Sequence, residues 1–391
     1  MDPRALVRPL EPAWQAVLDS VLGAQKTTDI AALAPKVAEL SRAYNAGTAA
    51  GAASRLPLDA RIAFSFPRDV PKGAAAVREL IASKALALGE EPLRILDLGA
   101  GLGAMTWGVA RALAAAGQKG RIEATLVDED AQALAVAEKI GRHATVDGIE
   151  LVLRTRKERL ATTASFPRAD LVLVGQVLSE LDLGRTPAER LDRHADLLRH
   201  LLTNAVTEHG SLVVIEPALR DRTRHLQTLR DRLAANATIF APCLHASACP
   251  MLADEDAWCH EDLPIDLPSF IVPLARAAGL RFQGLTFAYL VLRKDDLSLR
   301  KSVIHDDRVH LRIVSELLRS KGKTELFGCM ATGERWRIRR LDRDEERGQG
   351  TPFDDLAKGD LVRFSGGTEP PIDDRGRLIP VITIDVWRGA S

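Results

Sequence analysis

The sequence has no excess of charge of either sign, no long apolar run and few cysteines. Among its 391 residues, 53 Lys and Arg are balanced by 53 Asp and Glu, so the formal net charge is zero. A protein that coats nucleic acid by bulk electrostatics needs a sustained basic excess, so that class is excluded and only a local basic patch stays open. The longest apolar stretches, such as 171–174 and 212–215, are far shorter than the roughly 20 residues that span a bilayer. We therefore expect no membrane partner.

The first fifteen residues and the scarcity of cysteine bear on the compartment. Residues 1–15 carry Asp2 and Glu11 and lack the apolar core of a signal peptide, so neither a signal nor a transit peptide is predicted. We expect a cytoplasmic bacterial protein. In that reducing compartment, four thiols are better candidates for metal ligands or inert core residues than for disulfides.

The pattern along the chain predicts three regions. Residues 1–90 show helical apolar periodicity with Pro and Gly breaks. Residues 91–295 alternate short apolar strands with helical stretches, which is typical of an α/β fold with a mainly parallel sheet covered by helices on both faces. Residues 296–391 begin with a helix-like stretch, Arg308–Leu318, and continue as the strands of a small β domain, for which an OB-like barrel is one candidate.

The end of the second region departs from simple alternation. The last two predicted strands, Arg281–Phe287 and Tyr289–Arg293, follow each other too closely for a crossover helix, so they should pair antiparallel. The 65 residues 216–280 are more than one crossover helix needs. We therefore expect an insertion, which we place at 236–268.

Three glycines at alternate positions, Gly99, Gly101 and Gly103, follow the first predicted strand, Leu93–Leu98. Glycines there allow a tight turn and let a ligand lie close to the backbone at a helix N-terminus. The spacing also satisfies the dinucleotide pattern, and a turn without any ligand stays open. Asp97 discriminates between ligands, because its carboxylate suits a cationic amino group and would repel a pyrophosphate.

Asp128 ends the second predicted strand, where a carboxylate can accept hydrogen bonds from ribose hydroxyls. A purely structural role at a helix N-terminus is equally open for it. Together with Asp97 and the glycines, this pattern resembles the S-adenosylmethionine (SAM) site of class I methyltransferases. We place Gln176, directly after the fourth predicted strand, among the expected cofactor-binding residues.

The segment after the fourth predicted strand, 175–181, lacks the Asn/Asp-Pro-Pro-aromatic motif with which amino-methylating enzymes of this fold hold a target nitrogen. No cysteine lies at a strand end that would suit methylation of a base carbon. Positioning alone can carry much of a methyl transfer. We therefore name no catalytic residue.

Cys243, Cys249 and Cys259 lie in the predicted insertion, and Cys329 lies on a predicted strand of the C-terminal region. The four can converge only if the insertion folds back on that region. Their spacings are longer than those of zinc ribbons, and four thiolates from a loop and a distant strand can ligate an iron–sulfur cluster. A zinc site completed by nearby histidines and a metal-free arrangement stay open.

Residues 241–251, Ala-Pro-Cys-Leu-His-Ala-Ser-Ala-Cys-Pro-Met, and the following Trp258-Cys-His resemble the cysteine signature of a family of methyltransferase-like proteins. That family is associated with the small subunit of mitochondrial and related bacterial ribosomes. Further similarities lie at 64–69, 177–181, 214–217, 287–293 and 321–323. The chain departs from the family at 218–220, where Ala-Leu-Arg replaces the more common Gly-Thr-Pro.

The resemblance implies a class I SAM-dependent methyltransferase (Rossmann-like) sheet with a helical N-terminal region, a cysteine-bearing insertion and a small C-terminal β domain. It also implies a 4Fe-4S cluster on the four cysteines. The implied function is that of a SAM-dependent methyltransferase-like protein acting on small-subunit ribosomal RNA or on the assembling small subunit. Two alternatives are a non-catalytic assembly factor that keeps the fold and a zinc-stabilised methyltransferase of another substrate.

Residues 312–340 hold eight Lys and Arg against three acids, with aromatic residues interleaved. This pattern favours an RNA contact along one strand face, with a solvated charged face as the alternative. A second basic cluster lies at 220–232, on the predicted helix after the fifth strand. We expect a monomer that does not bind DNA. The candidate RNA-binding residues are Lys321, Lys323, Arg335, Arg337 and Arg339.

Overall fold

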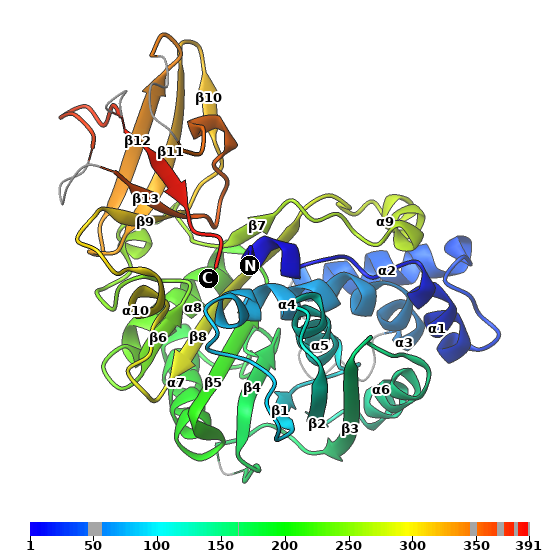
Figure 1. Ribbon diagram of the computed structural model, residues 1–391. Helices are drawn as coiled ribbons and strands as arrows, with labels where there is room; N and C mark the ends of the chain where they lie inside the picture. The colour runs from blue at the N-terminus through cyan, green and yellow to red at the C-terminus, as the bar shows by residue number, and fades with distance from the viewer. Residues whose placement is uncertain (46–56, 163, 345–349, 366–370, 379–381, 390–391) are drawn as a thin grey trace.

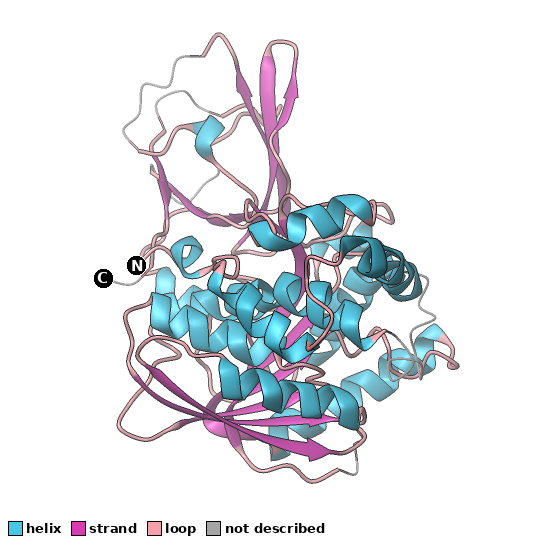
Figure 2. Cartoon of the chain, turned by 90° about the vertical axis from the view of Figure 1, so that its right-hand side faces the viewer, coloured by secondary structure: helices cyan, strands magenta, loops and turns pink. Residues whose placement is uncertain are grey.

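The computed structural model shows two β-sheets, of which the smaller projects from one end of the main body (Figures 1 and 2). Within the described part of the chain, no helix is both long and apolar enough to cross a membrane. The described residues are 1–45, 57–162, 164–344, 350–365, 371–378 and 382–389.

The larger sheet is mainly parallel. Its strands are β1 (Leu93–Leu98), β2 (Gly120–Asp128), β3 (Ile149–Lys157), β4 (Ala169–Gly175), β5 (Val206–Glu216), β6 (Thr238–Ala241), β7 (Glu261–Leu263) and β8 (Leu285–Arg293). The order is β3-β2-β1-β4-β5-β8-β6, in which the first five strands are parallel and β8 is antiparallel to β5. This order confirms the class I methyltransferase (Rossmann-like) fold expected from the sequence.

Helices cover both faces of the larger sheet (Figure 2). They are α1 (Ala13–Leu22), α2 (Ile30–Asn45), α3 (Leu58–Ala60), α4 (Phe66–Ala82), α5 (Ala104–Ala115), α6 (Ala131–His143), α7 (Pro187–Asn204), α8 (Arg220–Leu233), α9 (Val272–Ala277) and α10 (Leu299–Val303). Alternate residues of a strand point to opposite faces, so Leu171 and Leu173 of β4 pack with α4 and α5. Val172 and Val174 pack instead with α7 and α8.

Helix α4 packs directly on α5, because glycines occupy the contact. A Cβ atom on Gly73 would lie 2.4 Å from the carbonyl oxygen of Met105, and one on Gly108 would lie 2.2 Å from that of Val70. Close-packed interiors tolerate no such overlap, so a larger residue at either position would force the helices apart. The N-terminal helical region is thereby held against the helix that follows the glycine loop.

The end of the larger sheet differs from the sequence expectation. The segments Arg281–Phe287 and Tyr289–Arg293, expected as an antiparallel pair, form the single strand β8 after a short lead-in. Residues 285–293 contain no turn-forming residue, and the turn lies earlier, at Gly284, where φ is 73°. The antiparallel partners of β8 are β5, β6 and β7. The predicted insertion, 236–268, thus supplies two short strands to β8.

The smaller sheet comprises β9 (His310–Ile313), β10 (Leu318–Ser320), β11 (Lys323–Met330), β12 (Arg335–Leu341), β13 (Leu361–Phe364) and β14 (Ile384–Val386). The order is β10-β11-β9-β13-β14, and β12 pairs with β11. The helix expected over Arg308–Leu318 is therefore wrong. Strand β9 pairs with both β11 and β13, so tertiary pairing overrides the local periodicity. The OB-like barrel stays a prediction.

Buried ion pairs join the two sheets through α4. Arg312 of β9 pairs with Glu79 of α4 at 2.7 Å, and Arg78 of α4 pairs with Glu261 of β7 at 3.0 Å. The hydroxyl of Tyr289 in β8 donates to Glu79 at 2.6 Å. Removing one member would leave a buried charge uncompensated, which costs about 3–5 kcal/mol. These contacts fix the smaller sheet and the insertion relative to α4.

Candidate functional site

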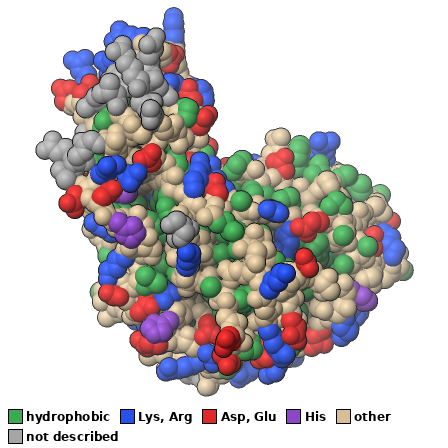
Figure 3. Space-filling model, viewed as in Figure 1, with side chains coloured by type: hydrophobic (Ala, Val, Ile, Leu, Met, Phe, Trp, Pro, Cys, Tyr) green, Lys and Arg blue, Asp and Glu red, His purple; other side chains and the backbone are tan. Residues whose placement is uncertain are grey.

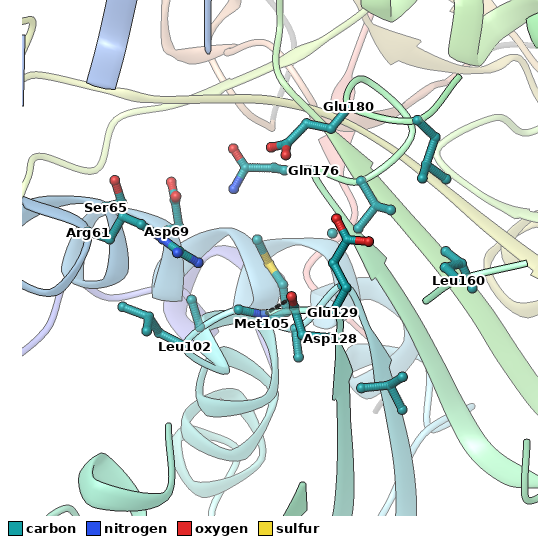
Figure 4. A pocket seen from close by; sticks show the side chains of 18 of the residues that line it. Arg61, Ser65, Asp69, Leu102, Met105, Asp128, Glu129, Leu160, Gln176 and Glu180 are labelled. Atoms are coloured by element: carbon teal, nitrogen blue, oxygen red, sulfur yellow. Dashed lines mark hydrogen bonds between the residues drawn. The ribbon is translucent and has the colours of Figure 1, made fainter. Parts of the chain in front are cut away.

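A cavity of about 260 Å³ lies at the carboxyl ends of β1, β2 and β4. Gly99 and Gly101 line it with φ of 66° and 52°, a conformation that favours glycine and brings the backbone close to a ligand. The helical N-terminal region forms the opposite wall through α4 and the π-helical segment Arg61–Ser65 that precedes it. Figure 4 shows Asp69 on this wall, facing Gln176 across the cavity.

This cavity is rich in carboxylates. Three cationic side chains line it, from Arg61, Arg68 and Arg159, against six acidic ones. We refer to it as the acidic cavity. A lining of this charge favours a cationic ligand over an anionic one. The acidic residues are Asp69, Asp128, Glu129, Glu158, Glu180 and Asp182.

Asp97 does not line the acidic cavity. The residue is 1% exposed, and its carboxyl accepts hydrogen bonds from the hydroxyl and the backbone N–H of Thr106 in α5, at 2.8 and 3.3 Å. Burial raises the pKa of Asp97 to about 7. In this arrangement Asp97 holds the start of α5 against β1, and its expected contact with a cationic amino group stays a prediction. Gly103 likewise lies outside the lining, at the N-cap of α5 with φ of 81°.

Asp128 does line the acidic cavity. One carboxylate oxygen accepts from the Gly101 N–H at 2.7 Å, and the other accepts from the Asp130 N–H at 2.8 Å. Asp128 therefore ties the glycine loop to the end of β2. Glu129 follows it and lies beside it in the cavity (Figure 4). The carboxylate of Asp128 keeps lone pairs with which to accept further hydrogen bonds.

A second cavity, of about 360 Å³, adjoins the first. The two share Tyr44, Ser65, Arg68, Gln176 and Glu180 in their linings. The second cavity is lined by the cations Arg68, Lys72, Arg222 and Arg281 against two carboxylates, Glu180 and Asp262. We refer to it as the basic cavity. The site thus has two compartments of opposite charge, divided by the segment after β4.

That dividing segment, 176–181, is held in an unusual conformation. Gln176 has φ of 60°, which is uncommon for a residue with a side chain, and its amide oxygen accepts a hydrogen bond from Lys72 at 3.3 Å. Glu216, at the end of β5, accepts from the N–H groups of Leu178 and Ser179 at 2.9 and 3.2 Å. Strained backbone held by its surroundings is concentrated at functional sites. Because Glu216 holds this segment by two hydrogen bonds, we describe it as a fixed partition between the acidic cavity and the basic cavity.

Glu180 stands at the junction of the two cavities. Burial, followed by repulsion from Glu216, raises the pKa of Glu180 to about 7. Burial also raises the pKa of Glu216 to about 7. A carboxyl with a pKa near neutrality can both accept and release a proton under physiological conditions.

The four cysteines lie near one another beside the smaller sheet. Cys249, Cys259 and Cys329 belong to one apolar cluster, and all four thiols are free. Burial and neighbouring cysteines raise the pKa of Cys249 to about 11 and that of Cys329 to about 12. Among the described residues, no three His, Cys, Asp or Glu side chains are arranged to hold a metal ion. The cysteine thiols therefore lie close together, but among the described residues they do not surround one point as the ligands of a single metal ion do.

The second basic cluster, on α8, does not form the free basic face that the sequence pattern had suggested. Arg224 donates to the carbonyl oxygens of Asp254 and Ala257 at 2.7 Å, and Arg220 pairs with Asp256 at 2.9 Å. Arg230 is buried and donates to carbonyl oxygens of residues 245 and 247. Most of these side chains therefore fasten the cysteine-bearing segment to α8.

The candidate RNA-binding residues lie on β11, β12 and the turn before β11, away from the two cavities. Figure 3 shows Lys and Arg side chains toward the far end of the smaller sheet. Glu325 accepts from Arg337 and Arg339 at 2.7 Å and pairs with Lys323 at 3.0 Å, so part of this charge is neutralised internally. These three cations hold the pKa of Glu325 down, at about 2, despite its burial.

Two of the residues in this region are not on a free surface. Arg335 pairs with Asp254 at 3.2 Å and lies over the ring of Phe327. Arg312, counted in the basic excess of 312–340, is buried in the ion pairs with α4. Lys321 lies at the exposed turn between β10 and β11. An RNA contact here stays a prediction.

Several residues of the site were not predicted from the sequence. Tyr44, Arg61, Ser65 and Asp69 come from the N-terminal helical region, which carried no site signal beyond the resemblance at 64–69. Glu180 lies in the quoted segment 177–181, but its place between two cavities depends on the fold. The signal that could have found it is a lone acid in an otherwise apolar segment directly after a buried strand.

Comparisons with known proteins identify a family for most of this chain. A sequence model of the family described as "Mitochondrial small ribosomal subunit Rsm22" matches residues 62–338. No curated protein matches the sequence significantly. The plantazolicin methyltransferase BpumL in complex with SAH is similar at 14% identity, with 68% of this chain and 98% of that chain covered and a TM-score of 0.36.

Two further solved structures are similar to a comparable degree. The N-methyltransferase NodS from Bradyrhizobium japonicum WM9 with SAH is 13% identical, covering 58% of this chain and 88% of that one, with a TM-score of 0.34. Magnesium protoporphyrin IX methyltransferase from Synechocystis PCC 6803 is 13% identical, covering 59% and 87%, with a TM-score of 0.34. Because these scores are low, the fold assignment rests on the strand order itself.

Proposed function

The chain belongs to the Rsm22 family, and from this premise we propose that it is a SAM-binding, methyltransferase-like protein of the small ribosomal subunit. The observation that carries the proposal is the acidic cavity at the carboxyl ends of β1, β2 and β4. In open α/β sheets, ligands bind outside the carboxyl ends of the strands. SAM carries a sulfonium and an amino group, so a carboxylate-rich cavity suits it.

The residues proposed to hold SAM follow from their positions. Gly99 and Gly101 allow the ligand to approach the backbone, and Asp128 offers a carboxylate to ribose hydroxyls. Gln176 lies opposite, at the end of β4. Asp97 would support the site indirectly, because it accepts a hydrogen bond from Thr106 and so positions the start of α5. When bound, SAM would supply an electrophilic methyl group, and the chain would position it.

Calorimetry with SAM tests this proposal. We expect saturable binding of one SAM per chain, weakened in Asp128→Asn and unchanged in Asp147→Asn, an exposed carboxylate outside the acidic cavity. Absence of binding to protein whose thermal unfolding is cooperative would remove SAM from the account.

We propose that the small-subunit association in the family's description extends to this chain, with small-subunit ribosomal RNA or the assembling subunit as partner. Because the description is mitochondrial, a cytoplasmic bacterial location stays a prediction. Radiolabelled SAM incubated with immature and mature small subunits tests for transfer. Subunit binding without label in RNA or protein would favour the alternative, a non-catalytic assembly factor.

We also propose a 4Fe-4S cluster on Cys243, Cys249, Cys259 and Cys329. Three of the four free thiols lie in one apolar cluster, and Cys243 lies close enough to interact electrostatically with Cys259, which suits sulfur ligation of iron. The cysteine spacings, which are longer than those of zinc ribbons, and the resemblance at 241–251 favour the cluster over zinc. The role of the iron–sulfur cluster would be to join the insertion to β11 of the smaller sheet.

Metal and sulfide analysis of anaerobically purified protein tests the cluster. We expect about four iron and four sulfide per chain, as the 4Fe-4S composition requires, and their loss in Cys329→Ser. About one zinc without sulfide would favour the zinc-stabilised alternative.

A further inference from the structure

The basic cavity is not used by the proposed SAM site, although the two share a wall. Its volume of about 360 Å³ lies within the range of small-molecule sites. It extends from Tyr44 and Phe64 of the N-terminal region to Asp262 and Arg281 on the far side of the partition. A molecule in it would lie beside the acidic cavity, where a methyl group would be presented.

One cation of the basic cavity, Arg222, favours an anionic occupant, because the other three are already paired with carboxylates. Arg68 and Lys72 are both paired with Asp69, at 2.9 and 2.8 Å, and Arg281 is paired with Asp262 at 3.3 Å. Arg222 differs, since among the described residues it has no carboxylate within ion-pair distance. The half-buried Arg222 guanidinium donates to the Tyr44 carbonyl oxygen. Its remaining N–H groups suit a phosphate.

The cavity also offers aromatic surface and a proton acceptor. Tyr44 lines both cavities, and burial raises the pKa of its hydroxyl to about 12, so the phenol stays neutral. A planar base can stack on such a ring. Glu180 stands at the boundary, where a carboxylate can accept a hydrogen bond from an exocyclic amine. The segment 175–181 lacks the Asn/Asp-Pro-Pro-aromatic motif of amino-methylating enzymes, so Glu180 would take the place of that motif's hydrogen-bond acceptors.

We propose that the basic cavity is the acceptor site for an amino-bearing nucleotide, cytosine or adenine, extruded from RNA, with its phosphate on Arg222 and its exocyclic amine against Glu180. This inference rests on the proposed function. Enzymes that act on a base take it out of the stack into such a pocket. The acceptor nitrogen forms a bond to the methyl carbon as the sulfur–methyl bond breaks and its electron pair returns to sulfur. The proton released from nitrogen passes to the Glu180 carboxylate and then to solvent.

Binding of mononucleotides to protein saturated with SAH tests this proposal without requiring turnover. SAH fills the acidic cavity, so the nucleotide reports on the basic one. We expect CMP to bind at least fivefold tighter than cytidine, because of the phosphate. Arg222→Gln should remove that advantage, while Arg319→Gln, an exposed arginine of β10, should keep it. Equal affinity of CMP and cytidine, together with equal affinity of AMP and adenosine, would overturn the phosphate site.

The role of Glu180 is tested by comparing nucleotides that carry an exocyclic amine with matched nucleotides that carry a carbonyl oxygen in its place. We expect CMP to bind more tightly than UMP, or AMP more tightly than IMP, and the preference to grow from pH 6 to pH 8. The charged groups that face Glu180 are Glu216 of β5, Arg61, Asp128 of β2, Arg222 of α8 and Tyr44 of α2, and burial dominates over them.

Glu180→Gln should remove most of the pH dependence of the preference for the amino base, since Glu216 still ionises but does not line the basic cavity. Asp182 lines the acidic cavity alone, so Asp182→Asn should keep the full pH dependence. No preference in either pair would overturn the assignment. If SAH itself does not bind, the proposed function fails. If SAH binds and the nucleotides do not saturate, this inference alone fails.

Discussion

The acidic cavity and the basic cavity share a wall but differ in charge, and the difference arises from which elements line them. The acidic cavity lies at the carboxyl ends of parallel strands, where β2 contributes Asp128 and the following turn contributes Glu129. The basic cavity draws instead on α4 for Arg68 and Lys72, on α8 for Arg222 and on the segment before β8 for Arg281. Most carboxylates of the acidic cavity therefore come from the ends of parallel strands, whereas the cations of the basic cavity come from helices and from the segment before β8.

This difference favours opposite ligands on the two sides of one partition. A sulfonium is attracted to the first cavity and a phosphate to the second. Because Glu216 fixes the partition through Leu178 and Ser179, neither cavity can expand into the other without breaking buried hydrogen bonds. The arrangement suits a transfer between a cationic donor and an anionic acceptor.

The largest expected effect comes from separating the helices that support the wall of the acidic cavity. In Gly108→Ala the new Cβ would lie 2.2 Å from the Val70 carbonyl, so α4 must move away from α5. We expect the free energy of unfolding to fall by about 1–3 kcal/mol and SAM binding to be lost. Thermal unfolding and calorimetry measure both. Gly89→Ala, where nothing lies within 4 Å of the added atom, is the matched control. Full SAM affinity in Gly108→Ala would contradict this role of α4.

The next largest effect is expected at Asp128. Asp128→Asn loses a charged acceptor for the Gly101 N–H and for the proposed ribose contact. Hydrogen bonds to charged groups contribute about 1.5–3 kcal/mol, so affinity should fall about 10- to 100-fold. Since SAM and SAH share the ribose, calorimetry should show the same loss for both. A loss confined to SAM would mean that Asp128 acts only through its charge.

The third prediction concerns the pH dependence of SAM binding, which tests whether the negative charge of the acidic cavity attracts the sulfonium. With a pKa raised to about 7, Glu180 becomes ionised as the pH rises from 6 to 8, which adds negative charge beside the sulfonium. We expect the ratio of SAM affinity to SAH affinity to rise by about threefold over this range, equivalent to about 0.6 kcal/mol. The amino group common to both ligands cancels in the ratio. In Glu180→Gln the rise should be clearly smaller, since Glu216 and Asp97 also have pKa values of about 7 but do not line the acidic cavity. A rise as large as that of the wild type would exclude Glu180.

The smallest effect is expected at the rim of the basic cavity. Arg281 has a side chain that is 62% exposed and already paired with Asp262, so Arg281→Ala should weaken CMP binding by about twofold at low salt. At high salt the difference should vanish, because exposed charges are screened. Titrations at two salt concentrations measure it. A tenfold loss would place the phosphate on Arg281 rather than on Arg222.

Much of the fold could be predicted from the sequence, because the five parallel strands are short apolar runs separated by helices. The glycine loop and Asp128 were also recognisable, since their chemistry is local. Asp97 shows the limit of such reasoning, because its burial against Thr106 depends on how α5 packs. The helix expected over Arg308–Leu318 failed for a similar reason, since β9 is fixed by pairing with two distant strands.

The basic cavity could not be predicted at all. Its lining combines Tyr44, Glu180, Arg222 and Arg281, which are spread over more than 230 residues of sequence and carry no common motif. Long-range packing alone brings them together. The basic residues of α8 illustrate the same point, since composition indicated an exposed patch and the fold uses Arg224 and Arg230 to hold the insertion.

A crystal structure of the protein grown with SAH and CMP would test the two-cavity account most directly. The account predicts SAH in the acidic cavity with its ribose at Asp128. It also predicts CMP in the basic cavity, with its phosphate at Arg222 and its amine within hydrogen-bond distance of Glu180. SAH bound outside the acidic cavity, or CMP bound away from the basic one, would contradict it.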